Sequence, residues 1–473
     1  MTEGKVRRVW VIGFAGHRAI GDPAATKAAI LACLREFREG MDGLVVGRAS
    51  AAAGADLLFL ECCRDLGLAY SIVLPFPKDR FALDFDDAAE WRRAEGLMAA
   101  ASNVEIAPGN EVAPEAYHLA AREILDVSDA MLFFWDGQPA RGIGGTAETV
   151  AEARERKLPL RIIEAAVGKL GSLEAPRPLP WSDPDFAALP PSPSVEELFK
   201  TLDHRAVRGA PRSRWFAAGS ISLNQLATIA TAVLVAFKLA ENAAPAIKFL
   251  VVTLAAILPW IGARLRISDA WMEDRVHAEL LRSLLASHSF APPLRPIAAD
   301  LFDEDAPLLR SAGWHLIRAR GDWRTARTNY LADRLDGQIR YLNEKGALAA
   351  RRLRIFWILF RVASIGAMTL GATAIAAGVW KWQVPEGVNR LLLNFLPTML
   401  PAIAAWCLAM IPLFEHKRRA KVYRRIASQL AEKRTMLVEA KCHTTAAAVV
   451  ASCERLLLTE LWEWTGTRGK RKR

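Results

Sequence analysis

Four long stretches without a charged side chain follow residue 214 in this 473-residue sequence. They cover residues 215–237, 249–263, 362–380 and 391–414. As helices, the first and the last are long enough to cross ~30 Å of hydrocarbon. The run at 249–263 is short for a span, so we expect Ile247 to complete it while Lys248 extends its amine toward water. Soluble cores rarely contain such runs, and the pattern predicts four transmembrane helices arranged as two hairpins.

Basic residues gather at the ends of these predicted hairpins. Residues 1–174 carry 20 Lys/Arg and 26 Asp/Glu, whereas the remaining residues carry 42 and 25. The dense basic clusters lie at 205–214, 264–266, 351–354 and 417–421, outside both hairpin loops. Because cytoplasmic flanks are enriched in Lys and Arg, this pattern predicts that both termini and segment 265–354 face the cytoplasm. An excess of basic residues can also indicate nucleic-acid binding. Because these basic residues lie beside long apolar runs, the membrane interpretation is favoured, and no specific nucleic-acid binding is expected.

The first third of the chain alternates short apolar runs with helical patterns. The runs are VWVIGF, LVVG, AYSIVLPF, AMLFFW and LPLRII, and the helical patterns cover 23–39, 54–66, 86–101 and 146–156. This rhythm is typical of an α/β domain with a parallel sheet covered by helices. Ligands of such sheets bind at the carboxyl ends of the strands, where loops meet helix N-termini.

Three loops of this domain follow predicted strands. In the first, Gly13 and Gly16 allow a close backbone approach, His17 offers a hydrogen-bond donor, and Arg18 presents a fork of donors suited to phosphate. In the second, Gly54 and Asp56 begin a helix, where Asp56 is interpreted either as an N-cap or as a ligand contact.

The third loop runs from Asp136 through a glycine cluster into a helix. The candidates there are Asp136, Gly142, Gly144, Gly145, Thr146 and Glu148. Free N–H groups and the positive end of the helix would face an anion above Asp136. Arg80 and Arg122 are weaker candidates, for which a solvated helix charge is an equally good interpretation.

Five ordered blocks in residues 5–165 resemble the SLOG family of Rossmann-like nucleotide-sensing domains, related to LOG phosphoribohydrolases and to the DNA-processing protein A fold. The blocks are GFAGHR, SAAAGADLLFLE, VLPFPKDRFALDF, AYHLAAREILDVSDAMLFFWDGQPARGIGGTAE and ARERKLPLRII. The resemblance implies a pocket for a nucleotide or nucleotide-derived signal, with Gly16, Arg18, Gly54, Asp56, Asp136, Gly144, Gly145, Thr146 and Glu148 at matching positions.

One departure from the hydrolytic LOG enzymes bears on catalysis. Their motif is PGGxGTxxE, but Thr149 occupies the place of the glutamate here, and Glu148 lies one residue early. A helix turns about 100° per residue, so this shift points the carboxylate elsewhere. We therefore expect binding without turnover and no cofactor, and the alternative is a membrane-tethered nucleotide hydrolase that uses Glu148.

The membrane half resembles a second family. YLADRLDGQIRYLNEKGALAARRL before one apolar run and KRRAKVYRRIASQL after the next are similar to SLATT proteins, the SMODS and SLOG-associating 2TM effectors. This resemblance covers about 320–440 well and 200–290 only by analogy between the hairpins. It implies a homo-oligomeric effector of a bacterial conflict system that damages the inner membrane in response to a nucleotide.

These observations together predict a division of the chain. The expected parts are a nucleotide-binding domain (1–173), a Pro-rich linker (174–196), a first hairpin region (197–290), a cytosolic helical segment (291–354), a second hairpin with C-terminal helices (355–465) and a basic tail (466–473). With seven prolines in residues 174–194, the linker is expected to be an extended connector rather than a packed element. The six cysteines form no CxxC pair and no metal-spaced Cys/His cluster, so neither a metal site nor a disulfide framework is expected.

Overall fold

A computed structural model describes residues 5–109, 113–139, 145–166, 168–176, 178–237, 244–264 and 267–466. The chain forms two compact units. One comprises residues 1–198 and 287–321, here called the sheet unit, and the other comprises 199–286 and 322–473, here called the helical unit.

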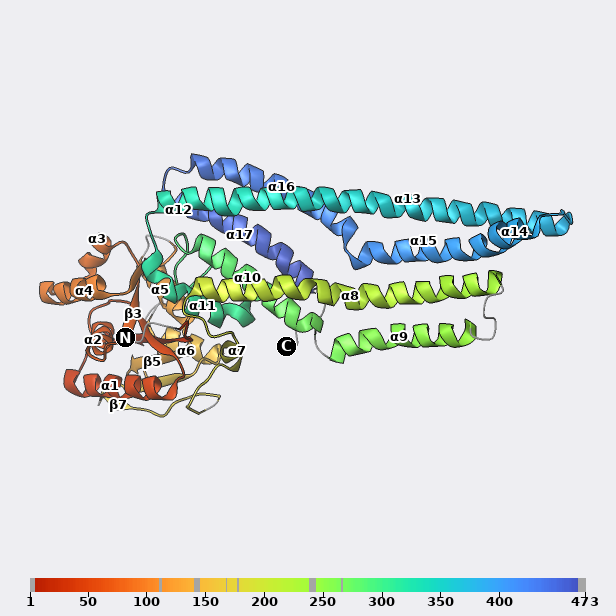
Figure 1. Cartoon of the computed structure of the whole chain (residues 1–473). Coiled ribbons are helices and arrows are strands. Elements are labelled where there is room, and N and C mark those ends of the chain that lie inside the picture. Colours follow the sequence, from red (N-terminus) through yellow and green to blue (C-terminus); the bar gives the residue numbers. More distant parts are fainter. Residues whose placement is uncertain are drawn as a thin grey trace. The chain divides into compact units, whose positions relative to one another are not determined.

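The sheet unit is built on a seven-stranded sheet of order β4-β3-β2-β1-β5-β6-β7 (Figure 1). Its strands are β1 (Val9–Gly16), β2 (Leu44–Ala49), β3 (Ala69–Leu74), β4 (Asn103–Ile106), β5 (Ala130–Trp135), β6 (Leu160–Glu164) and β7 (Lys169–Leu170). Only the pairing of β6 with β7 is antiparallel. The predicted Rossmann-like parallel sheet is therefore confirmed.

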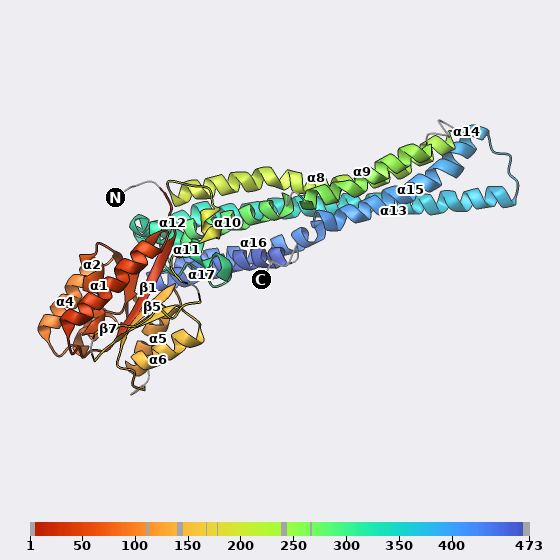
Figure 2. The same ribbon diagram turned by 90° about the horizontal axis from the view of Figure 1, so that it is seen from below.

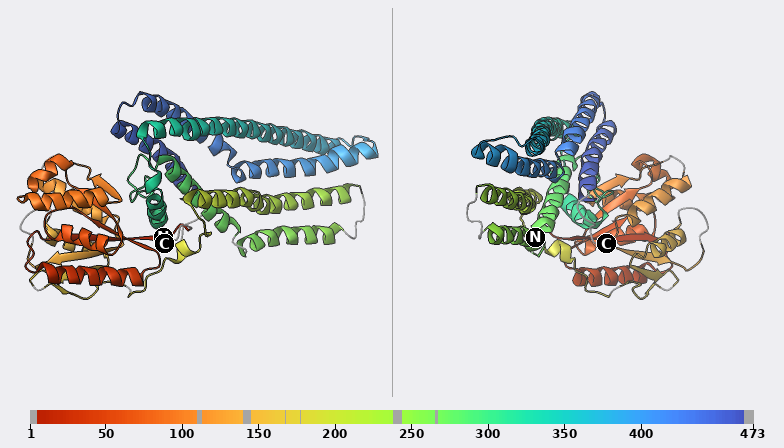
Figure 3. Two further views of the ribbon diagram at one scale, coloured as in Figure 1. Left: turned by 60° about the vertical axis from the view of Figure 1, so that its left-hand side comes forward. Right: turned by 90° about the vertical axis from the view of Figure 1, so that its right-hand side faces the viewer.

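Helices cover both faces of this sheet (Figure 3). They are α1 (Pro23–Gly40), α2 (Ala55–Asp65), α3 (Lys78–Phe81), α4 (Ala88–Ala100), α5 (Ala113–Leu125), α6 (Thr146–Glu155), α7 (Pro184–Ala187) and α11 (Ala306–His315), with short 3₁₀ turns at 82–84, 303–305 and 317–319. Along β1, Trp10, Ile12 and Phe14 join the core under α1, α2 and α4. Val9 and Val11 point to the other face, so β1 is buried on both sides.

The side of the sheet to which the chain adds strands changes at β1. From β1 the chain builds outward through β2, β3 and β4, and it then returns to add β5 on the other side of β1. In open α/β sheets, a crevice for ligands lies outside the carboxyl ends of the two strands that flank such a reversal. The loops after β1 and β5 meet at this point.

The Pro-rich segment differs from the extended connector that its composition predicts. Trp181 is only 3% exposed, and its ring lies 6.2 Å from the rings of both Trp10 and Phe37. Glu174 also forms an antiparallel bridge with Leu160. The prediction of an unpacked linker is wrong, because an apolar anchor within the prolines buries against the sheet.

Residues 287–321 also depart from their predicted placement in a cytosolic helical segment (291–354). They group with the sheet unit, where Leu294 and Trp314 pack on Val9 and Val11. The backbone N–H of Val9 donates to Ser311 Oγ at 2.9 Å. This face of β1 needs apolar cover, and a segment distant in sequence supplies it.

The helical unit contains long helices arranged largely as hairpins (Figure 2). They are α8 (Val195–Ala236), α9 (Ala244–Arg264), α10 (Ile267–Ser287), α12 (Trp323–Asn329), α13 (Gly337–Val379), α14 (Glu386–Val388), α15 (Leu396–Leu413), α16 (His416–Glu439) and α17 (His443–Gly466). π-helical turns at Tyr330–Asp336 and Asn389–Phe395 precede α13 and α15. The charged segments beside the apolar stretches are thus helical, from Trp323 into α13 and throughout α16.

Among the described residues of this unit, two helices are long and apolar enough to cross a membrane. Counted through their π-helical turns, they cover Trp323–Val379 and Glu386–Glu439. The apolar parts of α8 and α9 are shorter, at Ala218–Leu234 and Pro245–Ile261. Two candidate spans are therefore found where the sequence predicted four.

Buried polar contacts join the helices of this unit. Ser220 Oγ donates to the carbonyl of Ala255 at 2.6 Å, linking α8 to α9, and Trp406 Nε1 donates to Ser222 Oγ at 3.1 Å, linking α15 to α8. Such pairs satisfy polar atoms that would otherwise face an apolar environment. The contact between Trp406 and Ser222 also connects the two hairpins directly.

Candidate functional site

The carboxyl ends of β1 and β5 bring two predicted site residues into contact. His17 Nε2 lies 3.1 Å from Asp136 Oδ1 and 3.2 Å from the backbone nitrogen of Asp136. The backbone N–H of His17 also donates to the carbonyl of Phe134 at 3.2 Å. Because these contacts extend the pairing of β1 with β5 beyond the strands, they fix the loops on both sides of the crevice.

Two glycines bring the start of α2 against the loop after β1. A Cβ on Gly16 would lie 2.7 Å from the Cβ of Ala55, and one on Gly54 would lie 2.1 Å from the carbonyl oxygen of Arg18. Gly54 also has a φ of +91°, which L side chains rarely adopt. These positions need glycine so that the two loops can share the crevice.

Replacing Gly54 by alanine is expected to displace the loop at 16–18. The new Cβ meets backbone and adds an unfavourable φ, which together destabilise the local structure by about 1–3 kcal/mol or more. Hydrogen exchange of the loop amides in the full chain would report this as faster exchange. Gly96→Ala is the matched control, because a Cβ there, within α4, has no neighbour within 4 Å. Equal exchange in both variants would contradict the assigned packing.

Asp56 is the most buried acidic candidate of the crevice, at 6% exposure. Its Oδ1 has no hydrogen-bond partner among the described residues. Burial raises the pKa of Asp56 to about 8, while the amides of Gly16 and Ala52 and the charge of Arg18 oppose that shift. At neutral pH this carboxyl is therefore largely protonated and can donate a hydrogen bond.

The interpretation of Asp56 as an N-cap is wrong. The residue in the cap position of α2 is Gly54, which makes no side-chain cap bond, and Asp56 lies within the first turn. The first amide of α2, that of Ala55, donates to the backbone carbonyl of His17 at 3.2 Å in place of a side-chain cap. This leaves both a positive helix end and a neutral acid beside the crevice.

Arg18 and Arg80 belong to one cluster around Tyr117. The guanidinium of Arg18 lies 6.0 Å from the centre of the Tyr117 ring, and the Tyr117 hydroxyl donates to Asp84. Arg80 Nη1 pairs with Asp84 Oδ1 at 2.8 Å, and its guanidinium lies 4.7 Å from the centre of the Phe76 ring. The cluster therefore combines exposed cations with aromatic faces, a surface suited to a phosphate and a base.

The third predicted loop is described only in part. Gly142 and Gly144 lie outside the described residues, whereas Gly145 occupies the N-cap position of α6 and Thr146 begins that helix. Glu148 lies in its first turn, and its Oε1 is 3.7 Å from His118 Nδ1 of α5. Sequence reasoning missed His118 as a neighbour of Glu148.

Two other predicted residues have structural roles in the described contacts. Gly13 lies within β1, where a Cβ would be 2.2 Å from Met131 Sδ and 2.3 Å from Ser128 Oγ, so its small size serves packing of the sheet. Arg122 of α5 pairs through Nε with Glu152 of α6 at 3.3 Å. This contact fits its interpretation as a helix surface charge.

The crevice offers donors and few uncompensated anions. Asp84 is paired with Arg80, Asp56 is largely neutral below pH 8, and Asp136 lies 3.1 Å from His17, which balances its charge only when the imidazole is protonated. An anionic ligand would therefore meet the Arg18 guanidinium and helix amide groups rather than repelling carboxylates. Among the described residues no group of three or more His, Cys, Asp or Glu is arranged to hold a metal ion.

Comparison with known proteins does not place this chain in a family. No family model matches it, and no curated protein matches it.

Proposed function

We propose that the sheet unit binds a nucleotide or nucleotide-derived anion, and that the helical unit is a membrane effector whose state the ligand controls. The observation that carries the first half is the convergence of His17, Asp136, Arg18 and the neutral Asp56 at the reversal point of the sheet. The blocks that resemble SLOG domains include all four residues. A binder is favoured over a catalyst because Glu148 is out of register with the LOG motif.

The second half of the proposal treats all four apolar stretches as membrane spans. Support comes from the two helices that pass the length and apolarity test, and from the contact between Trp406 of α15 and Ser222 of α8. The resemblance of 320–440 to SLATT proteins adds a function, which is permeabilisation of the bacterial inner membrane by a homo-oligomer. In this arrangement the basic flanks keep the sheet unit and both termini in the cytoplasm, where nucleotides are available.

Control by a ligand requires a difference in affinity between two states. A nucleotide that binds the closed and the permeable assembly with equal affinity does not change the equilibrium between them, however tightly it binds. The bound ligand must therefore favour the permeable state through contacts that the closed state lacks. The crevice is a suitable place, because Arg18 follows β1 and Arg80 lies on α3, two separate segments that a phosphate can draw together.

Arg18→Ala is expected to abolish nucleotide-triggered leakage from dye-loaded liposomes that contain the purified full chain. Loss of the guanidinium removes charge-assisted bonds to phosphate and should weaken nucleotide binding about tenfold or more. A panel of cyclic and linear nucleotides supplies the ligands, and isothermal titration calorimetry measures binding. Arg35→Ala is the control, since Arg35 is an exposed arginine toward the far end of α1. Equal leakage from the wild-type chain and the Arg18 variant would overturn the proposed site.

A hydrolase remains the second candidate because His118 lies beside Glu148 in the arrangement of an acid–base pair. In that case the same panel would yield altered nucleotides rather than leakage, and Glu148→Gln would eliminate the products. Chromatography of the liposome supernatant distinguishes the two functions. Absence of product across the panel would exclude the hydrolase for those substrates.

A further inference from the structure

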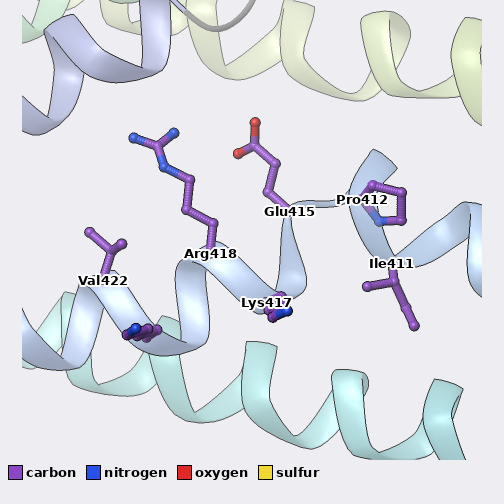
Figure 4. A pocket seen from close by; sticks show the side chains of 7 residues that line it. Ile411, Pro412, Glu415, Lys417, Arg418 and Val422 are labelled. Carbon is purple, nitrogen blue, oxygen red and sulfur yellow. The ribbon is translucent and has the colours of Figure 1, made fainter.

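The helical unit has a cavity at the bend between α15 and α16, outside the crevice described above. α15 ends at Leu413 and α16 begins at His416, and Glu415 between them has a φ of +54°, so the chain turns sharply there. The cavity has a volume of about 450 Å³ (Figure 4). Its lining residues are Ile411, Pro412, Glu415, Lys417, Arg418, Lys421 and Val422.

Aromatic packing holds this bend in place. The ring of His416 stacks on Phe356 of α13 at 5.8 Å and on Phe414 at 5.7 Å, and His416 is only 4% exposed. Phe356 also contacts Trp406 of α15, with ring centres 5.9 Å apart. The bend, and with it the shape of the adjacent cavity, is thus fixed by the packed helices.

The polar half of the cavity is cationic. Lys417 and Lys421, one helical turn apart, have no ion pair within the described structure and are exposed. Arg418 Nη2 already lies 3.6 Å from a carboxylate oxygen of Glu460 and 3.8 Å from one of Glu463, so its charge is balanced within α17. The two lysine ammonium groups suit an anion that has several oxygens, as phosphate does.

The one acidic lining residue is engaged elsewhere. Glu415 Oε2 lies 3.7 Å from the guanidinium of Arg419, so its charge is partly balanced by a cation that does not line the cavity. In Figure 4 the side chains of Glu415 and Arg418 extend toward the same side of α16. The lining therefore keeps a net positive charge toward a bound group.

Apolar residues also line the cavity. Ile411 and Pro412 come from the last turn of α15, and Val422 lies beyond the charged residues on α16 (Figure 4). A cavity that presents both cationic and apolar side chains at the end of an apolar helix matches the boundary between a lipid headgroup and its acyl chains. A free inorganic ion would use only the cationic residues.

We propose that this cavity binds the phosphate-bearing headgroup of an anionic phospholipid, with the phosphate between Lys417 and Lys421 and the glycerol region on Ile411 and Pro412 at the end of α15. The proposal rests on the membrane insertion proposed above. It makes the bend a specific lipid site rather than a diffuse basic flank. Bound lipid would stabilise the angle between α15 and α16, and hence the packing of the helical unit.

The test uses the purified full chain in detergent, with short-chain phosphatidylglycerol as the probe and thermal unfolding as the readout. Phosphatidylglycerol is expected to raise the unfolding midpoint of the wild-type chain, and phosphatidylcholine of equal chain length is not. In the double variant Lys417→Gln/Lys421→Gln, the half-saturating phosphatidylglycerol concentration should rise about tenfold or more, because two cationic contacts are lost. Arg424→Gln/Arg425→Gln is the matched control, since both arginines are exposed on α16 and neither lines the cavity.

Three results would overturn the proposal. If the half-saturating phosphatidylglycerol concentration rose equally in the control variant, the attraction would be diffuse electrostatics rather than a site. If phosphatidylcholine raised the unfolding midpoint as much as phosphatidylglycerol, the cavity would not recognise the headgroup. The same stabilisation by inorganic phosphate at equal concentration would assign the cavity to a free anion. Carbonate extraction of cell membranes separates this test from the proposed function: a chain that leaves the membrane fraction refutes insertion itself, whereas a retained chain without lipid-specific stabilisation refutes only the site.

Discussion

Replacing Glu454 by alanine is expected to destabilise the helical unit by about 3–5 kcal/mol. Glu454 of α17 is fully buried, and it accepts bonds from Arg334 at 2.9 and 2.8 Å and from the Tyr330 hydroxyl at 2.8 Å. Without the carboxylate, the guanidinium of Arg334 stays buried and uncompensated. Its Nη1 already has no hydrogen-bond partner within the described part of the chain. Thermal unfolding of the full chain in detergent should show the midpoint of this unit lowered by roughly 10 °C.

Two comparisons separate the loss of the pair from a general effect of truncation. Glu432→Ala removes an exposed carboxylate from the adjacent α16 and is expected to change stability by less than about 0.5 kcal/mol. The double variant Arg334→Met/Glu454→Leu removes both buried charges and should recover most of the loss. If Glu454→Ala were no more harmful than Glu432→Ala, the buried ion pair would not hold α17 to the helix that precedes α13.

The parts of the sheet that sequence predicted are those buried on both faces. β1, β2, β3, β5 and β6 read as continuous apolar runs, because parallel strands between two helix layers expose no polar face. β4 and β7 have no such signal: β4 is a four-residue strand with partly exposed side chains at the sheet edge, and β7 has only two residues. Apolar runs in the sequence therefore do not predict strands whose side chains are only partly buried.

Long-range packing accounts for the errors in domain organisation. Proline content describes the local backbone of 174–194, but the contact between Trp181 and Trp10 depends on the finished sheet. The same holds for Trp314, which covers Val9 from about 300 positions away in the sequence. The residue pattern within either segment does not indicate which surface of the sheet the segment packs against.

The candidate site shows a similar division. Glycine loops after strands identified Gly16, Gly54 and the neighbourhood of Asp136, since turn chemistry and helix N-termini are local properties. Tyr117 and Asp84 were missed because they meet only when α5 crosses the sheet near the turn after α3. Gly13 was misassigned because a glycine that makes room for Met131 within a strand looks in sequence like a glycine in a loop.

Asp56→Asn is expected to stabilise the sheet unit at pH 9 and to have little stabilising effect at pH 4. In the folded protein burial raises the pKa of Asp56 from 3.8 to about 8, so the folded state holds a proton that the unfolded chain releases near pH 4. Stability therefore falls as pH rises between these two values, and the full loss, on the order of 5 kcal/mol, is present above pH 8. Asparagine does not titrate, so the variant lacks this fall. Hydrogen exchange of β1 amides in the full chain, measured from pH 5 to 9 and corrected for intrinsic rates, reports the stability of this unit.

Asp86→Asn is the control for this experiment, because it makes the same substitution at an exposed carboxylate of the same unit. Equal slopes in the wild-type chain and the Asp56 variant would show that Asp56 ionises freely in the folded protein. A steeper fall in the wild-type chain would mean that the fold tolerates a costly buried acid at the reversal point of its sheet. Retention of such a residue is expected where it serves binding, since packing alone would favour an uncharged side chain of the same shape.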